Sequence, residues 1–354
     1  MSSVQLIDPI KDPRWDRFVM DHPFGWICHL SGWKQVLENS FNHMKGYYFA
    51  LVDEKDDIKA GLPVFEVKSW LTGKRLVNIP FASLCDPLVS NSADMKELVK
   101  ASLKLKNELK SSFIEIRTFQ SGSMLNGDRL SQLNHYKNHY LLLQNDIEQI
   151  KKGFDRKTVR QSVNRAMKSN MKLIVADKES DLVTFYKLYT CTRKNIGLPP
   201  QPYKFFKMLW DTFLADDRIA LLLAEKDKQI IAGVIIFKFK NRVSAEYAAW
   251  NRQYKKICPN HFLYWTAIKI AHQEGYDIFD LGRTSSSNEN LMKFKDRWGT
   301  SIAELPYFFY PEVNSNQMSQ REITISYKIM KKIFTNLPQA SLPAIGKICY
   351  RHLG

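Results

Sequence analysis

The chain carries one pattern twice, as Ile58-Lys-Ala-Gly-Leu-Pro-Val-Phe-Glu-Val67 and as Ile230-Ile-Ala-Gly-Val-Ile-Ile-Phe-Lys-Phe239. The two copies align without a gap, and the alignment extends back to residues 33 and 205. In each copy, an amphipathic helix, an apolar strand and a charged turn precede an Ala-Gly pair that opens a second apolar strand. This similarity arises either by chance between two hairpins or by duplication of a domain.

The second copy extends in both directions into a longer series of elements. We expect strands at 173–176, 218–224, 230–238, 243–249, 277–280 and 303–310, and helices at 182–193, 203–213, 261–273 and 289–298. This order, β-α-α-β-β-β-α-β-α-β, is that of the GNAT acyltransferase fold. The first copy follows it more loosely, with strands at 47–51, 59–67 and 113–117 and a helix at 93–109.

We therefore predict an α/β (α+β) protein with two tandem GNAT-like domains. The first domain is expected at residues 1–148, the second at 149–312, and a basic amphipathic tail at 313–354. A length of 354 residues suits two domains of ordinary size. With 44% hydrophobic residues and few glycines and prolines, the composition excludes collagen-like and disordered chains.

The net charge of +16 favours an anionic partner, namely a nucleic acid, a phospholipid or a phosphorylated carrier. The five cysteines form no CxxC pair, so neither a disulfide framework nor a zinc site is indicated. No Walker loop, GxGxxG, HExxH or EF-hand pattern occurs, and we expect no metal and no tightly bound cofactor. Because we find no signal peptide or membrane-spanning stretch, we expect a cytoplasmic protein that meets the inner face of the membrane peripherally.

Three motifs in the second half carry a family resemblance: Tyr247–Trp265, Gly275–Ser285 with Asp280-Leu-Gly-Arg283, and Leu291–Gly299 with Phe294-Lys-Asp-Arg-Trp-Gly299. The chain resembles the FemAB family over most of residues 25–310, and within it the FemAB-related proteins found with exopolysaccharide and exosortase gene sets. The resemblance implies two GNAT-like domains with a cleft between them. It also implies transfer of an amino acid from aminoacyl-tRNA to an amine on a lipid-linked peptidoglycan precursor, or acyl transfer from acyl-CoA.

Acyl transfer to an amine needs a cation or donor where the oxyanion develops and anchors for the anionic substrates. We predict Lys295 as the oxyanion-stabilising group. Phe294 and Trp298 share a helical face that can be buried, and this leaves Lys295 on an adjacent face toward a cleft. The matching lysine of FemAB-like enzymes is implicated in this role; the alternative is a solvated helix lysine. Asp280 is the second predicted catalytic residue. An orienting or structural role is preferred for it over a direct chemical role. No general base could be named.

Several residues are predicted to bind substrate. Arg283 follows Gly282 and could hold a phosphate bidentately, or pair with Asp280. Tyr247 and Tyr264 could hydrogen-bond a substrate, although buried tyrosines are commoner. Asn260 opens a helix whose free N–H groups suit a phosphate. Trp33 is included because its segment belongs to the resemblance.

Two basic segments remain. Residues 151–172 hold eight cations and one acid, and they form either a solvated helix face or a site for tRNA or lipid phosphates, for which we single out Arg156 and Arg160. The tail from residue 321 mixes cations with apolar residues, so it either lies on an anionic membrane surface or caps the core.

The sequence thus predicts an N-acyltransferase that transfers an aminoacyl or acyl group to an amino group of a cell-envelope or polysaccharide precursor. The donor is aminoacyl-tRNA or acyl-CoA, and the acceptor is a lipid- or nucleotide-linked amine. CoA-using GNAT enzymes carry a glycine-rich pyrophosphate loop, whereas residues 252–260 lack glycine here. The alternatives are an acyl-CoA-dependent N-acetyltransferase acting on an amino sugar and a non-catalytic RNA- or lipid-binding protein.

Overall fold

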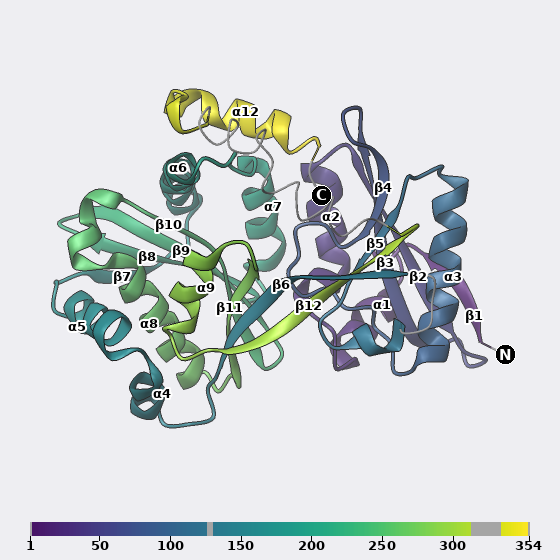
Figure 1. Cartoon of the computed structure of the whole chain (residues 1–354), viewed down its shortest axis with the longest axis horizontal. Coiled ribbons are helices and arrows are strands. Elements are labelled where there is room, and N and C mark those ends of the chain that lie inside the picture. Colours follow the sequence, from purple (N-terminus) through teal and green to yellow (C-terminus); the bar gives the residue numbers. More distant parts are fainter. Residues whose placement is uncertain (1, 126–129, 313–333, 353–354) are drawn as a thin grey trace. The chain divides into compact units, whose positions relative to one another are not determined.

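A computed structural model describes residues 2–125, 130–312 and 334–352 of the chain (Figure 1). Contacts between residues divide this part of the chain into two units. Unit 1 comprises the described residues up to 135, together with 304–312 and 347–352, and unit 2 comprises 136–303 and 334–346. The chain enters unit 2 within strand β6 (Ser131–Leu142) and leaves it within strand β12 (Ser301–Tyr310).

Unit 2 has the element order predicted for a GNAT domain. The elements are β7 (Lys172–Val175), α6 (Glu179–Ile196), α7 (Tyr203–Phe213), β8 (Ile219–Lys226), β9 (Gln229–Phe239), β10 (Arg242–Trp250), α8 (Pro259–Gln273), β11 (Ile278–Ser285) and α9 (Glu289–Asp296), followed by β12. Its strands lie in the order β7-β8-β9-β10-β11-β6. Neighbouring strands are antiparallel except for the parallel pair β10 and β11.

Unit 1 repeats this arrangement. Its elements are β1 (Ser3–Ile7), α1 (Pro13–Asp21), α2 (Ser31–Ser40), β2 (Met44–Val52), β3 (Ile58–Ser69), β4 (Gly73–Asn78), α3 (Ser92–Glu108) and β5 (Ile114–Arg117), followed by β6. Its strands lie in the order β1-β2-β3-β4-β5-β12, and among these described strands only β4 and β5 pair in parallel. The looser first copy of the pattern is therefore a second GNAT-like unit.

The last strand of each GNAT pattern is exchanged between the units. β6 follows β5 in the chain but pairs with β11, whereas β12 follows α9 but pairs with β5. The contact boundary consequently falls at residue 135 and again at 303, instead of at the limits 148 and 312 expected from the sequence. The expectation placed each domain in one continuous segment, and strand pairing across the repeat is what makes the units discontinuous.

A matched glycine in each copy supports the duplication physically. A Cβ atom on Gly61 of β3 would lie 2.6 Å from the Trp15 ring of α1, and one on Gly233 of β9 would lie 2.7 Å from the Phe185 ring of α6. Both distances are shorter than a carbon–carbon contact, so only glycine allows the aromatic ring to pack on the strand. Equivalent positions in the two copies thus perform the same packing task, which chance similarity does not explain.

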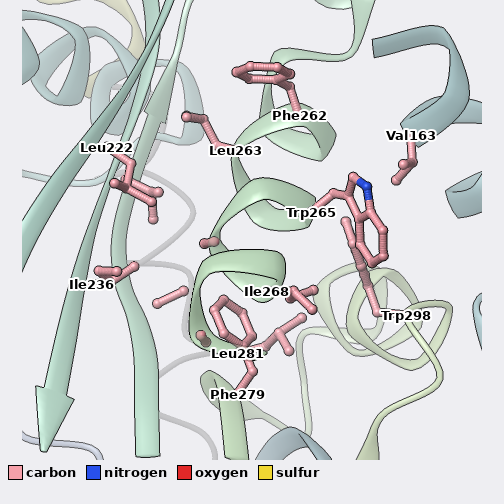
Figure 2. Close-up of a cluster of buried hydrophobic side chains, with 14 of the residues drawn as sticks. Val163, Leu222, Ile236, Phe262, Leu263, Trp265, Ile268, Phe279, Leu281 and Trp298 are labelled. Carbon is pink, nitrogen blue, oxygen red and sulfur yellow. The ribbon is translucent and has the colours of Figure 1, made fainter. Parts of the chain in front are cut away.

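The core of unit 2 holds α8 against the sheet. Figure 2 shows Leu263 of α8 facing the strands that carry Leu222 and Ile236, while Trp265 points toward Trp298. Phe279 and Trp298 are fully buried. Burial of such large side chains stabilises the unit and fixes α8 and the segment after α9 in place.

The basic segment 151–172 lies within unit 2 and does not join the two units. It forms the end of α4 (Ile147–Gly153), a π-helical turn at Arg156–Arg160 and helix α5 (Gln161–Met167). Val159 and Val163 are buried, so one face of this helical segment packs in the core of unit 2. The helical prediction is confirmed.

The predicted tail is described only in its last part. Helix α12 (Leu342–Cys349) is flanked by the 3₁₀ turn Gln339–Ser341, and residues 313–333 lie outside the described residues. Gln339 of the 3₁₀ turn donates a hydrogen bond to Cys191 of α6, and Tyr350 packs on Phe41 and Phe81 of unit 1. Within the described residues, no helix combines the length and the apolar character that crossing a bilayer requires.

Candidate active site

Two β-bulges lie next to each other in unit 2, where the parallel strands β10 and β11 stop pairing. Their ladder runs from Arg242 opposite Ile278 to Ser244 opposite Asp280. Directly beyond it, the register of β10 against β9 shifts between Ala245 and Tyr247, and that of β11 against β6 shifts between Asp280 and Gly282. Bulges redirect side chains and recur beside active sites.

Glu246 is the extra residue of the first bulge. The register passes from Ala245 opposite Ile236 to Tyr247 opposite Ile235, so Glu246 has no partner position on β9. Its carboxylate accepts a hydrogen bond of 2.5 Å from the Ser244 hydroxyl. Burial raises the pKa of Glu246 to about 7, although the side chain keeps some solvent access. A carboxyl group with this pKa can exchange a proton near neutral pH.

Lys295 of α9 reaches the second bulge. Its ammonium donates hydrogen bonds to the carbonyl oxygens of Gly282 at 2.7 Å and Arg283 at 3.1 Å. The residue is 6% exposed, so the alternative of a solvated lysine is wrong. Burial lowers its pKa to about 8, opposed by the attraction of Asp280 and Glu246. Lys295 is therefore a buried cation at neutral pH that interacts with the bulge carboxylates.

Gly282, whose carbonyl accepts the hydrogen bond of Lys295, adopts a backbone conformation that favours glycine. It has a left-handed φ of 80°, and a Cβ atom there would point toward the Lys295 ammonium at 3.9 Å and the Ala245 carbonyl at 3.7 Å. Both are ordinary contact distances, so glycine is required here by the left-handed backbone rather than by a lack of space. This explains the glycine of the Asp280–Arg283 motif in physical terms.

Asp280 organises the second bulge. Its carboxylate accepts hydrogen bonds from Arg242 at 2.6 Å, from Asn138 at 2.7 Å and from the Gly282 N–H at 2.6 Å. It is fully buried, and its ion pair is with Arg242. A carboxylate with all these donors holds the backbone in place, which agrees with the orienting role put first for Asp280.

We predict that Asp280→Asn destabilises the protein. Removing the negative charge breaks the ion pair between Asp280 and the largely buried Arg242 guanidinium, and breaking such a pair lowers the free energy of unfolding by about 3 kcal/mol. Urea denaturation followed by circular dichroism measures this change. Asp277→Asn is the matched control, since Asp277 bonds Asn241 at the partly exposed start of the same segment. Equal stability of the two variants would contradict the structural role.

Arg283 and Tyr264 border the same group of charges. Arg283 lies within β11 rather than beyond a strand ending at residue 280, because the bulge lets the strand continue to Ser285. Its guanidinium lies over the Tyr136 ring at 4.4 Å and interacts electrostatically with Glu246 and Lys295. Burial, and then the charge of Glu246, raises the pKa of Tyr264 to about 12, so its hydroxyl stays protonated and can donate.

Four aromatic side chains from α8 and from the FKxxWG motif pack together around Trp298. Trp298 is buried and lies 5.5 Å from His261, 5.8 Å from Tyr264 and 6.4 Å from Phe294 between ring centroids. Phe294 is only partly buried, and α9 ends before Trp298. Burial lowers the pKa of His261 to about 4, so its ring is neutral at physiological pH. Phe294 and Trp298 of the FKxxWG motif thus join His261 and Tyr264 of α8 in one aromatic cluster.

Two of the residues expected to bind substrate lie in cores. Tyr247 is 9% exposed, and its ring packs with Tyr189, Phe206 and Phe237. The bulge turns Tyr247 to the opposite face of the sheet from Ala245, which packs in the core that includes α8. Trp33 is 1% exposed within α2 of unit 1. Burial of both rings fits packing roles rather than the substrate contacts expected for them.

The other three candidates, Asn260, Arg156 and Arg160, also lie in unit 2. Asn260 is in the first turn of α8, after Cys258 in a left-handed conformation, and its Oδ1 is buried without a hydrogen-bond partner among the described residues. The exposed Lys255 and Lys256 precede it. Arg156 is exposed and Arg160 is half-buried in the π-helical turn. Within the described part of the chain, none of these three residues forms a hydrogen bond or an ion pair with Lys295.

The sequence analysis missed Glu246, the residue that supplies a titratable carboxyl to the site. Its segment, Val243–Trp250, has the alternation of an ordinary strand, in which one glutamate is unremarkable. One signal could have found it: a single acid stands among alanines and a tyrosine in an otherwise buried strand. Acidic side chains are rarely buried unless they are paired or functional.

The comparisons with known proteins agree with this geometry. A family model for an acetyltransferase (GNAT) domain matches residues 154–296, the range that carries both bulges and Lys295. The UDP-N-acetylmuramoylpentapeptide-lysine N(6)-alanyltransferase of Weissella viridescens is 20% identical over 336 residues, covering 88% of this chain and 98% of that protein. The chain is thus similar to FemAB-type transferases and contains a domain with the GNAT fold.

Solved structures extend the comparison to the whole fold of the chain. The crystal structure of FemX matches with a TM-score of 0.72 and 16% identity over 90% of this chain and 99% of that one. A tandem GNAT protein from the clavulanic acid biosynthesis pathway matches with a TM-score of 0.54 and 8% identity over 87% of this chain and 98% of the other. The predicted fold of tandem GNAT-like domains is thereby confirmed, and the relative's named alanyl transfer agrees with the predicted acyltransferase class.

Proposed function

We propose that this protein transfers an aminoacyl or acyl group to an amino group of a cell-envelope or polysaccharide precursor. The observation that carries the proposal is the buried Lys295 ammonium beside two β-bulges, within electrostatic reach of the Glu246 carboxyl. The Weissella viridescens relative, an alanyltransferase acting on the lysine of UDP-N-acetylmuramoylpentapeptide, supports an amine acceptor of the same class.

Lys295 stabilises the oxyanion in this proposal. An ammonium has three N–H donors, and among the residues that the structure describes two of them are used by the Gly282 and Arg283 carbonyls. The third is free to bond the carbonyl oxygen of the donor as it becomes negative. The surrounding burial strengthens this bond, because charge interactions are weakly screened in a low-dielectric site.

Glu246 accepts the proton that the attacking amine loses. As the C–N bond forms, the amine nitrogen becomes cationic, and the nearby carboxylate takes up its proton. The C–O bond to tRNA or the C–S bond to CoA then breaks, and the proton on Glu246 returns to the leaving oxygen or sulfur. A pKa of about 7 suits a group that both takes and returns a proton.

Arg283 and Tyr264 hold substrate near these two groups. The Arg283 guanidinium can bond an anionic substrate bidentately, and the Tyr264 hydroxyl can donate to it. The phosphates of the donor are proposed to bind at the start of α8. The binding groups there are the free N–H groups of the helix, Asn260, Lys255 and Lys256. Arg156 and Arg160 are proposed as a second contact for phosphate, and no resident metal or cofactor is required.

The function is tested by an assay of transfer with purified protein. Aminoacyl-tRNA or acetyl-CoA is supplied as donor and UDP-N-acetylmuramoylpentapeptide or an amino sugar as acceptor, and products are identified by mass spectrometry. An amide-linked product that requires the protein supports the proposal. Turnover with acetyl-CoA and an amino sugar alone would favour the N-acetyltransferase alternative, and ligand binding without any product would favour a non-catalytic protein.

We predict that Arg283→Ala weakens donor binding about 10- to 100-fold, since a charge-assisted hydrogen bond contributes about 1.5 to 3 kcal/mol. Calorimetric titration with acetyl-CoA, and filter binding with aminoacyl-tRNA, measure the dissociation constants. Lys228→Ala, which removes an exposed cation from the β8–β9 turn, is the control for a loss of positive charge alone. Unchanged affinity for whichever donor binds would remove Arg283 from the site.

Association with the membrane is the remaining part of the proposal. A lipid-linked acceptor would be met at the surface of a bilayer, and the basic, apolar segment from residue 321 suits such a surface. Most of that segment lies outside the described residues. We propose a peripheral contact on the cytoplasmic side, to which the tail contributes.

A further inference from the structure

The hairpin between β3 and β4 exposes two large apolar side chains at its tip. Trp70 is 85% exposed and Leu71 is 65% exposed, the two highest values among the exposed large hydrophobic residues of the described chain. Both belong to unit 1, far in sequence from the candidate active site. The hairpin projects beyond the neighbouring strands of this unit (Figure 1). The positions were not singled out by the sequence patterns.

The tip is an ordered loop. The Ser69 hydroxyl accepts hydrogen bonds from the N–H groups of Leu71 at 3.1 Å and Thr72 at 2.9 Å, and Gly73 closes the turn with a left-handed φ of 79°. These bonds satisfy the backbone of the loop while both apolar side chains point into solvent. A local structure that leaves most of a tryptophan ring in water indicates a surface that something else covers.

Cations surround this apolar tip. Lys68 and Lys74 lie opposite each other at the base of the hairpin, and both are exposed. Lys68 forms one ion pair, with the buried Glu66 at 3.2 Å. Between residues 68 and 75 the chain has three cations and no acid. The tip therefore combines apolar side chains at its end with positive charge behind them.

The C-terminal segment adds a further cation at the same place. His352 bonds the Ser69 hydroxyl at 2.9 Å, and its ring lies 5.1 Å from that of Trp70. The Arg75 guanidinium donates to the His352 carbonyl at 3.2 Å. These contacts hold the exposed Arg351 beside the hairpin. Two segments distant in sequence thus contribute to one surface of unit 1.

We propose that the tip of the β3–β4 hairpin, with Trp70, Leu71, Lys68, Lys74 and Arg351, docks on an anionic lipid bilayer. Tryptophan is favoured at the boundary between headgroups and acyl chains, because its ring is apolar while its N–H can bond polar groups. Lysine and arginine directly behind such a tip meet the negative headgroups. The apolar tip of the hairpin corresponds to the acyl-chain region of the bilayer, and the cations at its base correspond to the anionic headgroups.

The size of the patch favours a bilayer over a folded protein partner. Specific protein interfaces bury about 1,200 to 2,000 Å² in total and use about 20 to 30 residues on each side. A two-residue tip on a narrow hairpin offers much less, whereas insertion of one tryptophan and one leucine among headgroups needs no complementary surface. This inference does not depend on the proposed acyl transfer, since the hairpin carries none of the candidate catalytic residues.

The test is co-sedimentation of the full chain with vesicles in low salt. Wild-type protein is expected to bind vesicles of phosphatidylglycerol and phosphatidylcholine at least 10-fold more tightly than vesicles of phosphatidylcholine alone. Trp70→Ser with Leu71→Ser is expected to weaken binding to the anionic vesicles at least 10-fold, and Lys74→Glu with Arg351→Glu to remove most of the preference for anionic lipid. Higher salt should weaken wild-type binding because it screens the headgroup charge.

Leu6→Ser is the matched control for the tip variant, because Leu6 is 56% exposed on β1 of the same unit. It should leave vesicle binding unchanged. Unchanged binding by the Trp70→Ser, Leu71→Ser protein would overturn the proposal and move lipid contact to another segment, such as residues 321–354. Absence of wild-type binding to either vesicle would also overturn it and leave a protein partner as the occupant of the patch. Loss of transfer activity with normal vesicle binding would affect the proposed function alone.

Discussion

Lys295→Ala is expected to lower kcat by about 10²- to 10³-fold while changing the dissociation constant of the donor by less than about threefold. The reason lies in the two states of the donor carbonyl. In the ground state its oxygen carries little charge, whereas in the tetrahedral intermediate it is an anion beside the Lys295 ammonium. An interaction that forms mainly in the transition state affects turnover and leaves binding nearly intact. Single-turnover transfer and equilibrium titration of the donor measure the two quantities separately.

The same helix provides the control for this variant. Lys293→Ala removes an exposed lysine of α9 that pairs with Glu289, two residues from Lys295, and it should leave kcat unchanged. Because Lys295 also bonds the Gly282 and Arg283 carbonyls, thermal unfolding of the Lys295→Ala protein must be recorded in parallel. A fully folded Lys295→Ala protein that retains wild-type turnover would show that the oxyanion is stabilised elsewhere.

The duplicated fold shows why unit 2 rather than unit 1 carries the candidate site. In unit 1 the parallel pair β4 and β5 corresponds to β10 and β11, yet two charged side chains of β5 bond to each other. Arg117 and Glu115 are both buried and form an ion pair of 2.6 Å. The segment after β5 is a short 3₁₀ turn, Ser121–Leu125, in place of a helix that carries a lysine. The copy in unit 1 thus keeps the architecture but has no lysine at the position that corresponds to Lys295.

Much of the fold could be predicted from the sequence because local patterns determine it. The helix, hairpin and Ala-Gly repeat reflects periodicities of 3.6 and 2 residues, which survive at low identity. The strand β6 was missed, because Ser131–Leu142 is rich in asparagine, histidine and other polar residues. Its pairing with β11, and that of β12 with β5, depends on contacts between segments more than 100 residues apart along the chain, which no local pattern reveals.

The candidate site was predictable only in part. Lys295, Asp280 and Arg283 stand in motifs whose spacing points to one place, and the structure relates the three electrostatically. Glu246 and Tyr247 are neighbours in one strand, and alternation alone cannot say which of them faces the site. The answer depends on the bulge between Ala245 and Tyr247, a one-residue shift of register that turns the tyrosine into the core and leaves the glutamate at the lysine.

Glu246→Gln is expected to lower kcat by about 10²- to 10⁴-fold and to change the shape of the pH profile. In the wild-type protein Glu246 must be a carboxylate to accept a proton, so activity should rise as pH passes its pKa of about 7. Lys295 must be a cation, so activity should fall as pH passes its pKa of about 8. The profile is therefore bell-shaped, with its maximum between the two values. Glutamine keeps the size of the side chain and cannot take up the proton.

The ionisation of the acceptor amine also contributes to such a profile, but it is the same for every variant. The decisive comparison is therefore the ratio of wild-type to Glu246→Gln turnover as a function of pH. If Glu246 is the proton acceptor, this ratio falls toward one as pH drops below 7, because the wild-type carboxyl is then protonated and as inactive as the amide. Glu225→Gln on β8 of the same sheet should give a ratio near one at every pH. A ratio for Glu246→Gln that stays constant from pH 5 to 9 would mean that the glutamate only positions Lys295, and that the amine loses its proton to water or to the substrate itself.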